Sequence, residues 1–370
     1  ISNRPLACAS GMGINSIVAY TLCGAMGLGW QTAMAIIFVE GIAILLLVLC
    51  GLREAIMDAI PVSLRHGISI GLGLFIAMIG LKDGGIIVAN EATMVSLGSV
   101  TGPVFLVGLI SIVATVILSS MNVKGALLWG IVIASVLGIP LGVTAAPSSI
   151  VAPLDFSTFG APFMADANGV MGVVKALTTP ALLLFAFSLM MSDFFDTMGT
   201  VVAVGEQGKF VDKDGNVEDI QPILAVDSVA AAAGGFFGAS SITSFVESTS
   251  GAAAGARTGL SNIVVGVLFV VFAFFAPVIG MVSASATCGA LVVVGYLMLS
   301  DVTSIDWSKI EHAFPAFITI LGIPLTYSIT NGIGFGFISY CIIKVVQGKA
   351  CEVKPLMWIA AAAFMVMFVV

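Results

Sequence analysis

The chain has 370 residues, of which 59% are hydrophobic and only 9% charged, and its formal net charge is −7. Average soluble domains carry about 25% charged residues, so this composition predicts an integral membrane protein. The negative charges are spread over loops and a few buried positions, which indicates no nucleic-acid partner. Six cysteines show no C-x-x-C spacing and no histidine partners, so they predict neither a disulfide framework nor a metal site.

Apolar segments of about 20 residues follow one another along the whole chain, which predicts one polytopic bundle of roughly a dozen helices. The segments must be helical, because a lipid-exposed segment has to satisfy its own backbone hydrogen bonds. The hydrophilic stretch 205–221 is the clearest loop, and its Asp-Gly pair at 214–215 predicts a small hairpin. The predicted apolar segments are 11–28, 31–51, 67–81, 101–120, 125–143, 177–204, 222–238, 248–257, 261–282, 285–299, 314–329, 331–347 and 355–370.

Positive charge predicts the orientation of the bundle. If the loop 205–221 lies in the cytoplasm and the segments alternate from there, most lysines and arginines fall on the cytoplasmic side. Only Lys82 and Lys175 clearly fall on the opposite side. This asymmetry is what the positive-inside rule expects of a multi-pass protein in a lipid bilayer.

Two segments of the chain resemble each other. "CASGMGINSIVAYTLCGAMG" (8–27) and "GASSITSFVESTSGAAAGARTG" (238–259) both continue from Ala-Ser through a short polar run into a small-residue helix. Such interrupted segments in matching places indicate an inverted-repeat transporter, in which half-helices meet at the substrate site. We therefore expect the breaks near 8–15 and 238–247 to face each other, each with a short extended segment. The alternative is that Gly- and Ser-rich helices simply pack closely.

Comparison of the two matching segments also indicates that the first half has fewer helices than the second. Two apolar spans, 177–204 and 222–238, precede the second of the matching segments, whereas none precedes the first. We therefore expect that two helices are missing ahead of Ile1.

Carboxylates interrupt the apolar stretch "LLLFAFSLMMSDFFDTMGTVVAV" (183–203). Asp193 and Asp196 have no lysine or arginine within nine residues, and their spacing puts them on one helix face. Glu247 follows the polar break of the second half. An ionised carboxylate at the bilayer centre costs roughly 2.5–3.5 kcal/mol on insertion scales, so such acids are normally functional or paired. The structural alternative is that they cap nearby backbone groups.

Three stretches now carry a resemblance to a known family. "GMGIN" (11–15), "SDFFDTMGT" (192–200) and "SSITSFVESTSGAAAGARTGL" (240–260) resemble the signature segments of AzgA-type adenine/guanine/hypoxanthine permeases, a branch of the nucleobase–cation symporter 2 family. "FPAFITILGIPLTYSITNGIGFGFISY" (314–340) and "EVKPLMW" (352–358) resemble the C-terminal part of that branch. One departure is Ser10, which stands where the family pattern has proline.

The resemblance implies an all-α polytopic membrane protein of the plasma (inner) membrane, built as two inverted sets of seven helices with two broken helices, here without the first two helices. It implies a core domain that holds the substrate and a gate domain against which the core moves. The implied divisions are core 1–51, gate 52–143, core 144–282 and gate 283–354, followed by an apolar helix 355–370.

The resemblance also implies a function, which is uptake of purine nucleobases coupled to protons, without a cofactor or a metal. Asp193 and Glu247 would accept N–H groups of the base, as carboxylates can, and Asp196 would shape the site or couple the proton. Asn15 would supply a polar contact or tie the repeats together. Other candidates for substrate contact are Phe195, Ser241 and Thr243. Asp227 and Glu40 also lie within apolar segments, where each could pair with backbone or hydroxyl groups at the repeat interface, and they are weaker candidates for substrate contact. A homodimer is compatible with the family.

Other classes of function fit less well. A membrane prenyltransferase could bind Mg²⁺ through D-x-x-D, but it needs a second acidic cluster and several cations for its diphosphate. An intramembrane aspartyl protease requires a Gly-x-Gly-Asp segment, and a primary pump requires a G-x-x-x-x-G-K-[ST] loop that binds ATP phosphates. Neither segment occurs in this sequence. The main alternative is a carrier of uracil, xanthine or another small solute on the same fold.

Overall fold

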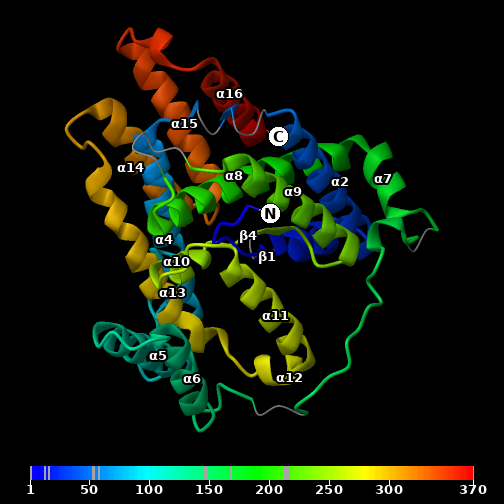
Figure 1. The fold of residues 1–370 in the computed structure, drawn as a ribbon, viewed down its shortest axis with the longest axis vertical. Coiled ribbons are helices and arrows are strands. Elements are labelled where there is room, and N and C mark those ends of the chain that lie inside the picture. The colour runs from blue at the N-terminus through cyan, green and yellow to red at the C-terminus, as the bar shows by residue number, and fades with distance from the viewer. Residues whose placement is uncertain are drawn as a thin grey trace. The chain divides into compact units, whose positions relative to one another are not determined.

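We analysed a computed structural model that describes residues 2–11, 14–15, 17–51, 55–56, 59–145, 149–166, 169–211 and 217–369 (Figure 1). Within these residues, six helices are long and apolar enough to cross a membrane. The predicted class, an all-helical polytopic membrane protein, is confirmed. The six are Trp30–Leu49, Val62–Asp83, Pro103–Ser120, Ile220–Phe237, Ala284–Ser304 and Ile329–Val346.

The chain divides into two compact units, each made of separate stretches of sequence. Unit 1 comprises Ile1–Ser69, Asp155–Ile263 and Thr303–Val370, and unit 2 comprises Ile70–Leu154 and Val264–Val302. These boundaries group residues by contact and do not follow the expected core and gate ranges, so the assignment of core and gate stays a prediction.

Unit 1 contains most of the helices and the sequence-predicted site. The long helix α8 begins at Pro180, where a missing N–H costs nothing, and ends at Gly208 before Lys209 in the left-handed conformation. The elements of this unit are β1 (Cys8–Ser10), η1 (Ile17–Ala25), α2 (Trp30–Leu49), the start of α4 (Val62–Asp83), η2 (Ala161–Phe163), α7 (Gly172–Thr178), α8 (Pro180–Gly208), α9 (Ile220–Phe237), β4 (Ile242–Ser244), α10 (Ser248–Ala253), the start of α11 (Leu260–Phe274), η3 (Leu299–Ser304) at its edge, α14 (Ile310–Leu325), α15 (Ile329–Val346), η4 (Ala350–Glu352) and α16 (Pro355–Val369).

Helices α2 and α9 pack so closely that their contact depends on glycine. A Cβ atom on Gly235 would lie 2.6 Å from the backbone nitrogen of Phe38, a separation that real Cβ atoms do not show. Gly41 on α2 meets the backbone of Ala232 in the same way. Close approach of helix backbones at small residues is the usual way in which membrane helices associate. The pair therefore fixes α9 in place, and α9 in turn leads into β4.

We expect Gly235→Val to destabilise unit 1 by about 1–3 kcal/mol or more, because the added carbons cannot be accommodated without moving a backbone. Thermal unfolding of the detergent-solubilised protein measures this as a lower melting temperature. Gly266→Val is the matched control, since a Cβ atom on Gly266 of α11 meets open space. Equal melting temperatures for the two variants would show that the α2–α9 contact tolerates separation.

The two polar breaks face each other as an antiparallel pair of strands. Cys8 pairs with Ser244, Ala9 with Thr243 and Ser10 with Ile242. Chain segments more than 200 residues apart are thus joined at the point where each half interrupts its helix (Figure 1). This confirms the sequence-based expectation that the breaks at 8–15 and 238–247 meet through short extended segments.

Unit 2 is a smaller bundle built on small residues. The hydroxyl of Ser111 on α5 donates to the carbonyl of Ala286 at 2.6 Å and accepts from the backbone N–H of Gly289 at 2.9 Å. These two bonds join α5 to α13. The elements of this unit are the rest of α4, β2 (Ile87–Asn90), β3 (Met94–Leu97), α5 (Pro103–Ser120), α6 (Ala126–Gly138), the rest of α11, α12 (Ala276–Ile279), α13 (Ala284–Met298) and the beginning of η3.

The structure differs from the predicted segments in three places. The segment predicted at 261–282 is not continuous, because α11 ends at Phe274 and α12 begins at Ala276. Pro277 explains the break, since proline cannot donate its own N–H and clashes with the preceding turn. The hairpin β2–β3 was not predicted, and Ile17–Ala25 forms a π-helix. The Asp-Gly turn predicted at 214–215 lies outside the described residues, although Val211 and Val217 on either side form an antiparallel bridge.

Candidate functional site

The segment that leads into β1 is anchored on the loop before α9. Arg4 forms ion pairs with Glu218 at 2.8 Å and with Asp219 at 2.7 Å, and its guanidinium lies 5.1 Å from the ring centre of Phe210. The side chain of Asn262 donates to the backbone carbonyl of Arg4 at 2.8 Å. These contacts fix the entry to the first polar break.

Ser10 and Asn15 connect the first break to the second. The Ser10 hydroxyl lies 2.8 Å from Oδ1 of Asn15 and 2.7 Å from the carbonyl oxygen of Ala239. The backbone N–H of Gly11 donates to the carbonyl of Ser241 at 3.1 Å. Ser10 and Gly11 therefore make the contacts across the two breaks, and Asn15 is joined to them through Ser10, so its expected roles stay a prediction. Ser10 serves as the hydrogen-bonding residue at the position where the family pattern has proline.

The two aspartates of α8 have different surroundings. Asp193 is fully buried, while Asp196 is partly exposed. Helix α8 packs against α10 and β4, which carry the second break. Asp196 is near enough to Asp227 and Glu247 to interact with both electrostatically. The structure thus brings three acids from α8, α9 and the start of α10 into one region beside the paired strands.

Asp227 holds the break in place. One carboxylate oxygen accepts from the backbone N–H of Ser244 at 2.7 Å, and the other accepts from the Thr197 hydroxyl at 2.9 Å. All of its side chain is buried. A single acid on α9 therefore joins the end of β4 to the turn of α8 that follows Asp193 and Asp196. The feature of the sequence that indicated a role for Asp227 is its position inside the apolar segment 222–238.

Glu247 stands immediately before α10. It occupies the N-cap position, its backbone carbonyl accepts from the Ser250 hydroxyl at 2.6 Å, and its side chain is partly exposed. The far end of α10 is closed by Arg257, whose guanidinium donates to the carbonyls of Ala252 and Ala256. Arg257 thus caps this helix at its C-terminal end, while Glu247 stands at the start.

Two hydroxyl residues of the second break complete the site. Ser241 is fully buried, and within the described part of the chain its hydroxyl has no hydrogen-bond partner. A buried hydroxyl without a partner costs free energy, which a bound polar ligand could offset. Thr243 is also buried and faces Ala9 in the strand pair. The side chain of Phe195 lies outside what the structure describes, so its stacking role stays a prediction.

The arrangement fits recognition of a small polar ligand. Among the described residues, no group of three or more histidines, cysteines or acids could hold a metal ion. Carboxylates accept N–H groups, and hydroxyls both donate and accept. Groups of these kinds at Asp193, Glu247 and Ser241 suit an uncharged solute that carries both N–H donors and acceptors.

Comparison with known proteins shows that this chain is a transporter. The sequence matches the Permease family over residues 1–369, and the chain belongs to that family. It is therefore an integral membrane permease and not an enzyme. The transmembrane domain of a cyanobacterium bicarbonate transporter, BicA, matches in fold with a TM-score of 0.56 at 15% identity, over 89% of this chain and 84% of that one. At such low identity this match supports the fold alone.

Individual members of the family are similar to this chain over nearly its whole length. Adenine permease AdeQ of Escherichia coli is 40% identical over 366 residues, which are 98% of this chain and 80% of that protein. Adenine permease AdeP of the same organism is 38% identical over 374 residues, 100% of this chain and 81% of that protein. Guanine/hypoxanthine permease PbuO of Bacillus subtilis is 36% identical over 379 residues, 99% and 84% of the two chains. The family resemblance expected from the sequence is confirmed.

Proposed function

We propose that this chain takes up purine nucleobases, with adenine, guanine and hypoxanthine as the candidate substrates. The observation that carries the proposal is the placement of Asp196, Asp227 and Glu247 in one region beside the paired strands β1 and β4, with Asp193 close to Cys8 of β1. The relatives of this chain are named adenine and guanine/hypoxanthine permeases. A purine presents N–H donors that carboxylates accept, and ring acceptors that hydroxyls and backbone N–H groups meet.

In this proposal Asp193 and Glu247 bind the base, and Ser241 and Thr243 donate to its ring acceptors. Asn15 and Ser10 hold the first break against the second. Phe195 stacks on the purine ring. The two acids stand on α8 and at the start of α10. Contacts with both acids would therefore fix the orientation of the base as well as hold it in the site.

The proposal extends to mechanism. Uptake is coupled to protons, with Asp196 as the coupling or structural acid, and an elevator-like movement carries the core past the gate in the plasma membrane. The proximity of Asp196 to two other acids, Asp227 and Glu247, supports a proton-linked role. Asp196→Asn is expected to flatten the pH dependence of uptake, which is measured between pH 5 and 8, while the affinity for the base stays within about threefold.

The test is uptake of radiolabelled adenine, guanine and hypoxanthine by bacterial cells that lack their own purine permeases and express this chain. Competition by a panel of unlabelled bases then ranks the substrates. We expect at least one purine to be accumulated, and uracil to compete poorly. Preferential accumulation of uracil would instead assign the chain to a pyrimidine carrier of the same fold.

A further inference from the structure

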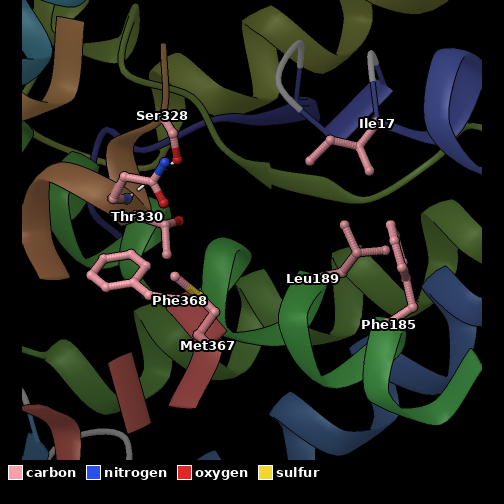
Figure 2. A pocket seen from close by; sticks show the side chains of 8 residues that line it. Ile17, Phe185, Leu189, Ser328, Thr330, Met367 and Phe368 are labelled. Atoms are coloured by element: carbon pink, nitrogen blue, oxygen red, sulfur yellow. Dashed lines mark hydrogen bonds between the residues drawn. The ribbon is translucent and has the colours of Figure 1, made fainter. Parts of the chain in front are cut away.

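A cavity of about 210 Å³ lies within unit 1, outside the group of acids described above (Figure 2). Its walls come from four elements: η1, α8, the start of α15 and the end of α16. Figure 2 shows Ile17, Leu189 and Phe185 on one side of the cavity, with Ser328, Thr330, Met367 and Phe368 on the other. The volume is below the 300–1,000 Å³ that drug-sized ligands occupy, so it suits a smaller molecule.

The cavity adjoins the proposed base-binding residues along two elements. Leu189 precedes Asp193 by one helical turn on α8, a rise of roughly 6 Å. Ile17 follows Asn15 by two residues at the start of η1. The cavity therefore begins about one turn away from the buried acid.

The predicted orientation places the cavity on the outer side of that acid. Helix α8 runs from Pro180 to Gly208, and its later end continues into the loop 205–221, which is expected in the cytoplasm. Phe185 and Leu189 therefore lie toward the opposite face. Helix α15 agrees, because Ser328 stands at its start while Lys344 near its other end pairs with Glu352 at 2.7 Å on the predicted cytoplasmic side.

The lining of the cavity selects for an uncharged ring. The eight residues that line it include no charged side chain, so an ion would lose its hydration there without compensation. Phe185 and Phe368 offer aromatic faces. Ser328 accepts from the backbone N–H of Asn331 at 3.3 Å, which leaves its hydroxyl hydrogen available to a ligand. The side-chain amide of Asn331 can both donate and accept.

We propose that this cavity is an outer docking site, in which an uncharged purine base is held between the aromatic walls and the Ser328 and Asn331 side chains before it reaches Asp193. The inference rests on the proposed function, because the base must be a substrate. A docking site of this kind raises the rate of capture at low concentration of the base and adds nothing at saturation.

The experiment is uptake of radiolabelled adenine by cells that express the whole chain, as a function of adenine concentration. Asn331→Leu keeps the size of the side chain and removes its amide, and Phe185→Leu removes one aromatic face. We expect both to raise the half-saturating concentration about five- to tenfold with an unchanged maximal rate. Phe187→Leu is the matched control on the same helix, since Phe187 is exposed and does not line the cavity, and it should behave as the parent does.

A second measurement guards against variants that fail to fold. Asn331→Cys should react from outside the cell with a membrane-impermeant thiol reagent beyond the level of the parent, and saturating adenine should protect it. Protection should persist when Asp193→Asn is added, because the outer site does not need the deeper acid. The contrary result is that the parent transports adenine while the variants keep its half-saturating concentration and adenine does not protect Asn331→Cys from labelling. This result would show that the cavity does not bind purines and is occupied by lipid or by rearranged side chains. Failure of the parent to take up any purine would instead reject the proposed function.

Discussion

Asp193→Asn is expected to weaken purine binding about ten- to a hundredfold while the amount of protein in the membrane stays normal. The substitution keeps the shape of the side chain but replaces one acceptor oxygen with a donor. One N–H of the base then loses its acceptor, and each polar group left unpaired costs about 1–3 kcal/mol, where 1.4 kcal/mol corresponds to a factor of ten. Glu247→Gln should have a similar effect, because both acids are proposed to hold the same base. Competitive binding of adenine to the two variants measures the loss.

The matched control for these substitutions is Glu91→Gln, which makes the same chemical change in the exposed turn between β2 and β3 of unit 2. It should leave binding unchanged. If both Asp193→Asn and Glu247→Gln retain the affinity of the parent, these acids serve the fold, and the base has to be held by the strand pair and its hydroxyls. A loss in one variant alone would assign the base contact to that acid.

Much of this site was predictable from the sequence, because its elements leave local signals. The interrupted segments around Ser10 and Ser241 stand in matching places of the two halves. This placement predicted that the two breaks face each other, and the pairing of β1 with β4 confirms it. Asp193 and Asp196 were visible because carboxylates are rare in apolar segments. Positions of this kind can be found by the cost of placing a charge in a membrane.

What could not be predicted depends on contacts between distant residues. An acid inside an apolar segment signals a role, but only the fold shows that the two oxygens of Asp227 meet Ser244 and Thr197. The cavity beside Leu189 depends on how the start of α15 and the end of α16 approach α8. The hydrophobic periodicity of these helices does not predict how they pack against one another. The break at Phe275 was open to prediction from Pro277, because proline at that position interrupts the helix.

The second large effect is expected at Asp227. Asp227→Ala leaves the Ser244 N–H and the Thr197 hydroxyl without their buried acceptor, at about 1–3 kcal/mol each. We expect a clear fall in melting temperature and a loss of most uptake, because β4 is released from α8. Asp227→Asn retains one acceptor oxygen for the Ser244 N–H, and the Thr197 hydroxyl can reverse its direction to accept, so the fall should be smaller. Thermal unfolding and adenine uptake of both variants measure these effects.

A double-mutant cycle then shows whether Asp227 acts through Thr197. Thr197→Val removes one of the two donors, so its effect on stability and that of Asp227→Ala should overlap, and the double variant should be less destabilised than the sum of the two single variants. Ser228→Ala provides the control. Ser228 neighbours Asp227 on α9, but its hydroxyl donates to the carbonyl of Leu224 in its own helix, so its effect should add to that of Thr197→Val. Additive effects of Asp227→Ala and Thr197→Val would mean that Asp227 does not stabilise the break through Thr197.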